Sequence, residues 1–141
     1  MRWGILVVTV FLGVGIGAAV KAKPIEDQGP FGPNYVPSGE VLYRQFCANC
    51  HGLDAKGDGP MAAALKVPPA NLTLLAKKNM GKFPRESVER TLRFGTGPTA
   101  HGTSDMPAWG PIFQFFDKNN ERAVQRRIKN LCDYLESVQV K

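Results

Sequence analysis

Two cysteines and a histidine stand within five residues of this 141-residue chain, in the order Cys47-Ala48-Asn49-Cys50-His51. Residues at positions i, i+3 and i+4 project to one side of a helical turn. Both thiols and the imidazole can therefore bind the same group. A segment with this spacing is expected to fold as a short helical turn with one face left free, so it restricts the local structure more tightly than any other part of the chain.

Four interpretations of the motif compete. C-x-x-C-H is the attachment sequence of a c-type haem, with Cys47 and Cys50 as thioethers and His51 on the iron. A thioredoxin-type site is disfavoured because no alternating strand and helix pattern surrounds it. A zinc site needs four ligands and would recruit Cys132 or His101. A disulfide between Cys47 and Cys50 would leave His51 without a role. We therefore expect one covalently attached haem c.

Composition is that of one globular domain. The chain has 43% hydrophobic and 21% charged residues, and its three cysteines are too few for a disulfide-built mini-domain. The net charge of +6 favours acidic partners or anionic surfaces. It is not the dense basic stripe of a nucleic-acid binder, so no nucleic-acid partner is expected.

The N-terminus carries an export signal. Residues 3–20 are uncharged, with Arg2 before them and Lys21 after them. This run is longer than the apolar stretch of most signal peptides and approaches the length that spans a bilayer. Residues 1–22 are thus either a cleaved signal peptide or a retained membrane anchor. Both alternatives export the rest of the chain to the periplasmic side, where it is soluble or anchored to the inner membrane.

Residues 23–37 are rich in proline and glycine and cannot form a helix. They are expected to be a semi-extended tether that holds a domain off the membrane. The alternative is a loop that wraps the domain, with Phe31 and Tyr35 as its packing points. In both cases the domain proper comprises residues 38–141.

Helical patterns divide this domain into four or five short helices, and strand candidates are almost absent. Ser38 can cap a helix that continues to Phe46. Further helices are expected over 61–66, 72–78, 85–94 and 124–138. The last is the clearest, because its apolar residues recur at helical spacing: Val124, Ile128, Leu131, Leu135 and Val138. The stretch 95–111 is expected to be irregular and functional.

A haem iron held by one histidine needs a sixth ligand or keeps an open position. The candidates are Met61, Met80, Met106 and His101. Met106 is favoured because Pro107 stiffens the backbone beside it and because it lies in the irregular stretch. Met61 and Met80 are expected to be packing residues. His101 is expected to bond the backbone or a haem propionate in the haem surroundings.

The run Cys47-Ala48-Asn49-Cys50-His51-Gly52, with the later run Asp105-Met106-Pro107-Ala108-Trp109, resembles the class I c-type cytochromes, especially the small bacterial monohaem domains. The resemblance covers about residues 38–139. It implies an all-α, cytochrome c-like fold around one covalent haem, here preceded by an N-terminal apolar helix. It also implies that the first helix crosses the last at Gly39 and Tyr43, near Leu131, Tyr134 and Leu135.

The same resemblance assigns two further haem-site roles. A proline carbonyl of the Pro68-Pro69 pair, with Pro69 favoured, is expected to accept the Nδ1 proton of His51, which fixes the imidazole. Trp109 is expected to pack near the haem, the alternative being a simple core tryptophan.

Ligation by histidine and methionine leaves no open iron site, which predicts one-electron transfer and not catalysis. The leading hypothesis is an exported respiratory electron carrier that meets redox proteins with acidic docking surfaces. The alternatives are a membrane-anchored haem subunit of a larger respiratory oxidoreductase complex, or a haem enzyme or gas sensor with open iron.

Two features of the last helix lie outside the haem motif. Its basic residues Arg122, Arg126, Arg127 and Lys129 are expected to form a solvated face, with docking to an acidic partner as the alternative. Cys132 is expected to be a small buried hydrophobe, with an intermolecular disulfide as the alternative.

Overall fold

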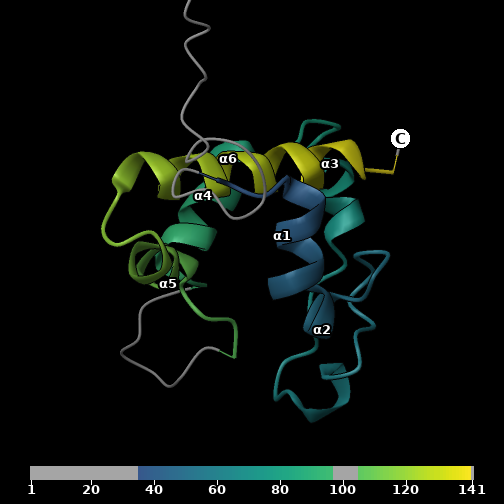
Figure 1. The fold of residues 1–141 in the computed structure, drawn as a ribbon. Coiled ribbons are helices and arrows are strands. Elements are labelled where there is room, and N and C mark those ends of the chain that lie inside the picture. Colours follow the sequence, from purple (N-terminus) through teal and green to yellow (C-terminus); the bar gives the residue numbers. More distant parts are fainter. Residues whose placement is uncertain (1–34, 97–104, 141) are drawn as a thin grey trace, which may run out of the picture.

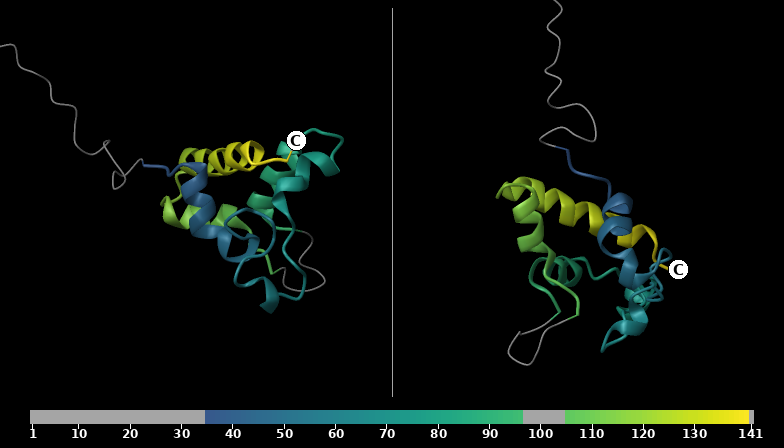
Figure 2. Two further views of the ribbon diagram at one scale, coloured as in Figure 1. Left: turned by 90° about the vertical axis from the view of Figure 1, so that its right-hand side faces the viewer. Right: turned by 60° about the horizontal axis from the view of Figure 1, so that its bottom comes forward.

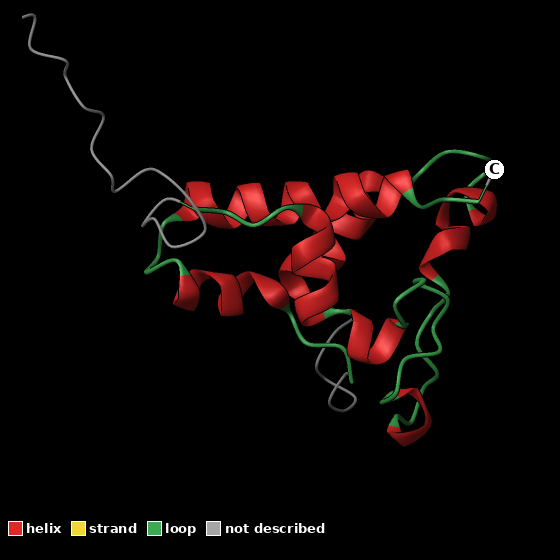
Figure 3. Ribbon diagram, turned by 45° about the vertical axis from the view of Figure 1, so that its right-hand side comes forward, coloured by secondary structure: helices red, strands yellow, loops and turns green. Residues whose placement is uncertain are grey.

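The computed structural model describes residues 35–96 and 105–140, which are helical and contain no strand (Figures 1 and 3). These residues form six α-helices and two short 3₁₀ turns: α1 (Gly39–Phe46), α2 (Ala48–His51), η2 (Ala62–Ala64), η3 (Leu72–Leu74), α3 (Leu75–Lys78), α4 (Arg85–Phe94), α5 (Trp109–Phe116) and α6 (Glu121–Ser137). The all-α expectation is therefore confirmed for the described residues.

The expected N-terminal apolar helix, residues 3–20, lies outside the described residues, as does most of the expected tether. Within residues 35–96 and 105–140, no helix combines the length and the apolar character that crossing a membrane requires. The choice between a signal peptide and an anchor thus stays a prediction.

Three of the expected helices form, and the structure shows how each is capped at one end. The Ser38 side chain accepts a hydrogen bond from the Val41 amide at the start of α1. Helix α4 occupies the expected residues and ends at Gly95, whose φ of +84° suits glycine. Helix α6 begins after Asn120, whose side chain accepts from the Ala123 amide.

Two of the expected helices are shorter in the structure. Residues 61–66 yield only the turn η2, and residues 72–78 are divided between η3 and α3. Asn71 caps the turn η3, because its Oδ1 accepts from the Thr73 amide at 3.0 Å.

Helix α5 was not expected, because its first turn contains Gly110 and Pro111. Proline is tolerated in the first turn of a helix, where its missing N–H would have had no intrahelical partner. The expected irregular stretch therefore ends at Ala108, and the helix that follows brings Trp109 and Phe113 to the core.

The crossing of α1 and α6 organises the fold (Figures 1 and 3). A Cβ on Gly39 would clash with the Asn130 carbonyl and would lie 2.7 Å from Tyr134 Cβ, so only glycine allows this approach. The rings of Tyr43 and Tyr134 lie 5.2 Å apart at the same crossing. The expected contact between the first and last helices is thus confirmed.

The core lies between α1, α4, α5 and α6. Its largest fully buried side chains are Leu42, Tyr43, Phe113, Val124, Ile128, Leu131 and Cys132. Figure 2 shows these four helices gathered on one side, while α2 and the loop of residues 53–71 extend from the end of α1. The cysteine–histidine motif therefore stands where the packed core ends.

Candidate functional site

The motif of residues 47–51 forms the helical turn that its spacing predicts. Cys47, with φ of −114°, ends α1 and begins α2 at the same residue. Its carbonyl accepts from the His51 amide at 2.9 Å. Gly52, with φ of +79°, ends α2, and its carbonyl accepts the Tyr43 hydroxyl at 2.6 Å. This buried bond fixes the turn to α1. Burial, followed by the charge of Cys47, raises the pKa of Tyr43.

His51 is buried and held by one hydrogen bond, from its Nδ1 to the carbonyl oxygen of Ala70 at 2.9 Å. A carbonyl only accepts, so Nδ1 carries a proton, and Nε2 is the ring nitrogen left to bind another group. The same bond makes the ring a stronger donor to a metal. His51 can therefore bind a metal ion through Nε2.

The acceptor differs from the expected Pro69 by one residue. The carbonyl oxygen of Pro69 lies instead against Gly57, a position without a Cβ whose φ is +88°. The expected kind of bond is therefore present in the expected loop, but the residue assignment was wrong.

The two motif thiols are free in the structure and partly buried. Burial, followed by the charge of Cys50, raises the pKa of Cys47 to about 12. A redox-active dithiol needs a thiol whose pKa is lowered, so the environment of Cys47 is the opposite of a thioredoxin-type site.

A zinc site finds no support in the part of the chain that the structure describes. In residues 35–96 and 105–140, no three side chains of histidine, cysteine, aspartate or glutamate are grouped so as to hold a metal ion. Cys132, one of the two candidates for a further zinc ligand, is fully buried in the core. His101, the other candidate zinc ligand and an expected neighbour of the haem, lies outside the described residues.

Met106 is half-buried and packs against the core cluster, as does Trp109. Figure 1 shows its segment, residues 105–108 in green, below α5, and the Lys66 amide of the loop 53–71 donates to Asp105 of this segment at 3.0 Å. By contrast, Met80 is 97% exposed and Met61 is 49% exposed, so the expectation that they are packing residues was wrong. Of the three described methionine candidates, only Met106 lies against the core.

Trp109 belongs to an aromatic cluster beside the motif. Its ring stacks on Phe113 with centroids 5.9 Å apart, and it lies 5.3 Å from Phe46, the residue before Cys47. Phe116 also contacts Phe46, at 6.0 Å. The role of Trp109 beside the haem stays a prediction. The sequence analysis did not identify Phe46, Phe113 or Phe116 as members of this cluster, although the apolar run of residues 112–116 contains two of them.

Arg127 is not part of a solvated face. Its guanidinium donates two hydrogen bonds to Asp117, at 2.7 and 2.8 Å, and lies over the ring of Phe113. The side chains of the pair are only 12% and 9% exposed. The expectation of a solvated face was wrong here, because the end of α5 covers this position. Arg122 and Arg126 are exposed as expected.

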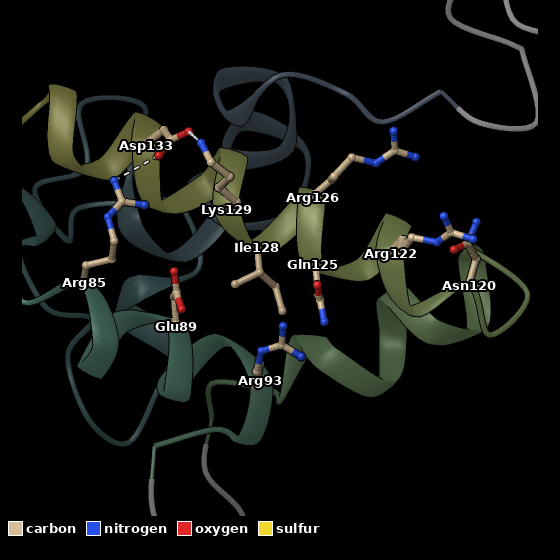
Figure 4. A pocket seen from close by; sticks show the side chains of 10 residues that line it. All are labelled: Arg85, Glu89, Arg93, Asn120, Arg122, Gln125, Arg126, Ile128, Lys129 and Asp133. Carbon is tan, nitrogen blue, oxygen red and sulfur yellow. Dashed lines mark hydrogen bonds and ion pairs between the residues drawn. The ribbon is translucent and has the colours of Figure 1, made fainter.

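An open groove of about 1060 Å³ lies between α4 and α6 (Figure 4). Its cations are largely neutralised: Arg85 pairs with Asp133 and Glu136, and Lys129 pairs with Asp133. Arg93 pairs with Glu121. Figure 4 shows Arg126 extending away from α4. The groove contains neither the motif nor Met106, so it is not the centre of the chemistry.

These observations fit a covalently attached haem. Two neighbouring thiols, an imidazole with Nε2 available and an aromatic cluster are grouped at the end of the core, with a thioether sulfur in the segment before α5. Comparison with protein families gives one match: the model described as cytochrome c oxidase, cbb3-type, subunit III covers residues 34–125. Comparisons with curated proteins and with solved structures found no significant match.

Proposed function

The chain belongs to the family described as cytochrome c oxidase, cbb3-type, subunit III, and on that premise we propose that it is an exported one-electron carrier with His51 and Met106 as axial ligands. Membership means a c-type cytochrome domain with a covalently bound haem c and a general role in haem-based electron transfer. When bound, the haem supplies a reversible one-electron couple at its iron. The specific ligands, compartment and partners are the proposal.

The proximal side is carried by the motif itself. Cys47 and Cys50 hold the haem covalently, and His51 offers Nε2 because its Nδ1 is bonded to Ala70. This hydrogen bond is the single observation that carries the proposal. It fixes the ring in the tautomer that an axial ligand requires and restrains its rotation.

The distal side is assigned to Met106. Its sulfur would close the sixth position and favour the reduced iron relative to a second imidazole. Ligation by His51 and Met106 would exclude substrate from the iron, which supports a carrier and not a haem enzyme or gas sensor. Trp109 and Phe113 would keep water from this side.

The place of action is proposed from residues 3–20 and from the family. An uncharged run at the N-terminus would export the domain and, if retained, anchor it to the membrane. A family described as an oxidase subunit favours a second candidate function, in which the chain delivers electrons inside a larger respiratory complex. In both cases exposed cations such as Arg122 and Arg126 would steer acidic partners.

The test is an optical spectrum of the full chain, expressed with and without the haem-maturation machinery. We expect colour, and loss of free thiols at Cys47 and Cys50, only with the machinery. M106A should lose the low-spin spectrum and bind carbon monoxide when reduced, whereas M80A should match the wild type because Met80 is 97% exposed. A spectrum that M106A leaves unchanged would remove Met106 from the iron. Recovery of the chain in a stable membrane complex would favour the second candidate.

A further inference from the structure

One hydrogen bond connects the loop that leads away from the motif with the segment that carries Met106. The backbone amide of Lys66 donates to Oδ2 of Asp105 at 3.0 Å, across 39 residues of sequence. Asp105 immediately precedes Met106. Four residues beyond Lys66 is Ala70, whose carbonyl holds His51. The segments of both proposed axial ligands are therefore fastened to the same short stretch, residues 66–70.

We propose that Asp105 is a positioning residue that keeps Met106 at the iron by fastening residues 105–108 to residues 66–70. This inference rests on the proposed ligation by His51 and Met106. Asp105 acts through the backbone that follows it and does not itself touch the haem.

The stretch that receives Asp105 is suited to serve as a fixed support. Pro68 and Pro69 restrict its backbone. On one side of it, the Met61 amide donates to the Asn49 carbonyl at 2.9 Å, which fastens the loop to α2. On the other side, the Leu72 amide donates to the Ala55 carbonyl at 2.8 Å. A segment that is hydrogen-bonded to this stretch is therefore held at a fixed position relative to the motif.

The Met106 segment has a firm attachment at its other end. Pro107 stiffens it, and Ala108 leads directly into α5, where Trp109 and Phe113 pack against the core. Between these attachments, the Asp105 carboxylate is the group that reaches across to the loop. An ionised acceptor makes a stronger hydrogen bond than a neutral one. Without it, the described contacts that hold residues 105–108 would be the packing of Met106 against the core and the connection to α5, and Met106 could leave the iron more often.

Both partners of the bond can be altered separately. D105A removes the acceptor, and D105N keeps an oxygen that can accept from the same amide. K66P removes the donor, because proline has no N–H. The residue before it, Leu65, has φ of −89° and ψ of 144°, the extended conformation that a following proline requires. D54A is the matched control, since it removes one exposed carboxylate whose ion pair is with the nearby Lys56.

The measurement is carbon monoxide binding to the reduced, haem-loaded full chain, together with the low-spin absorption and the thermal midpoint. We expect D105A and K66P each to bind carbon monoxide about tenfold faster than the wild type, the effect of losing one charge-assisted hydrogen bond. D105N, which keeps a weaker neutral bond, should fall between the wild type and D105A, and D54A should stay within about twofold of the wild type. The double variant D105A/K66P should equal either single variant, because both remove the same bond.

Three results would overturn the proposal: rates near the wild type in both D105A and K66P, a rate in D54A as fast as in D105A, or additive effects in the double variant. M106A separates this failure from failure of the ligand assignment. If M106A leaves the spectrum unchanged, Met106 is not the ligand. If M106A opens the iron while D105A and K66P do not, Met106 is the ligand and Asp105 does not position it.

Discussion

The half of the molecule built from α1, α4, α5 and α6 differs sharply from the half that carries the motif, here α2 with residues 53–71 and 105–108. In the helical half, Leu42, Tyr43 and Leu131 are fully buried. In the loop 53–71 the buried hydrophobic residue is Ala55, while Leu53 and Val67 are 64% and 71% exposed. The helical half has its own apolar core, and the motif half depends on hydrogen bonds. A small domain of this kind relies on its bound cofactor for part of its stability.

The largest effect should follow removal of the haem. The double variant C47S/C50S cannot form thioethers, so we expect the motif half to lose its order while α1 and α6 keep theirs. Amide hydrogen exchange measures this: residues 53–71 should lose protection and the amides of α6 should remain slow. N49A is the control, because it lies between the two cysteines and is exposed. Equal loss of protection in both halves would abolish the distinction.

The next largest effect should come from the buried ion pair of the helical half. R127L leaves the carboxylate of Asp117 buried without its partner, which costs about 3–5 kcal/mol of unfolding free energy. R126Q alters the neighbouring, exposed residue and should cost less than about 0.5 kcal/mol. Urea denaturation of the haem-loaded protein measures both. A cost below 1 kcal/mol for R127L would mean that water reaches Asp117.

The helix crossing should give a somewhat smaller cost. G39A places a Cβ against the Asn130 carbonyl, so α1 must move away from α6. We expect a loss of roughly 2–3 kcal/mol, as for other overpacked contacts. E40A, at the exposed next position, is the control. If the reduced G39A protein also binds carbon monoxide faster than the wild type while E40A does not, the two halves are more tightly coupled than their packing indicates.

The sequence predicted the helical half better than the motif half, for a physical reason. An amphipathic helix repeats its pattern over several turns, so α1, α4 and α6 follow from apolar spacing and caps. Helix α5 was not predicted because Gly110 and Pro111 are typical of loops, although proline is tolerated in the first turn of a helix. Arg127 was misassigned for a related reason: nothing local indicates that the end of α5 covers it.

The site divides in the same way. Attachment through Cys47, Cys50 and His51 depends on neighbours in sequence, so spacing sufficed to predict the turn. The acceptor of the His51 proton depends on how residues 53–71 return to the motif, and Pro69 and Ala70 cannot be distinguished without that path. The bond from Lys66 to Asp105 joins residues 39 apart and has no sequence signature.

The smallest effect concerns how dry the helical core is at Cys132. Burial raises the pKa of this thiol from its ordinary value near 9 to about 12, with Glu89 as the next cause and Arg85 opposing. A raised folded-state pKa contributes stability that is complete below pH 9 and is lost as pH rises towards 12. C132A has no thiol at this position and so lacks this pH-dependent contribution to stability, whereas the contribution of Tyr43 is the same in both proteins. The wild type should therefore lose about 1.4 kcal/mol relative to C132A between pH 7 and pH 10.

Urea denaturation under reducing conditions at pH 7, 8, 9 and 10 measures that difference. At pH 7 C132A should be less stable by about 1 kcal/mol because of the cavity it leaves, and near pH 10 the order should approach equality or reverse. A difference that does not change with pH would mean that the Cys132 thiol ionises in the folded protein as easily as in the unfolded chain. Such a result would require water at the α6 side of the core, and the helical half would then be no drier than the half that carries the motif.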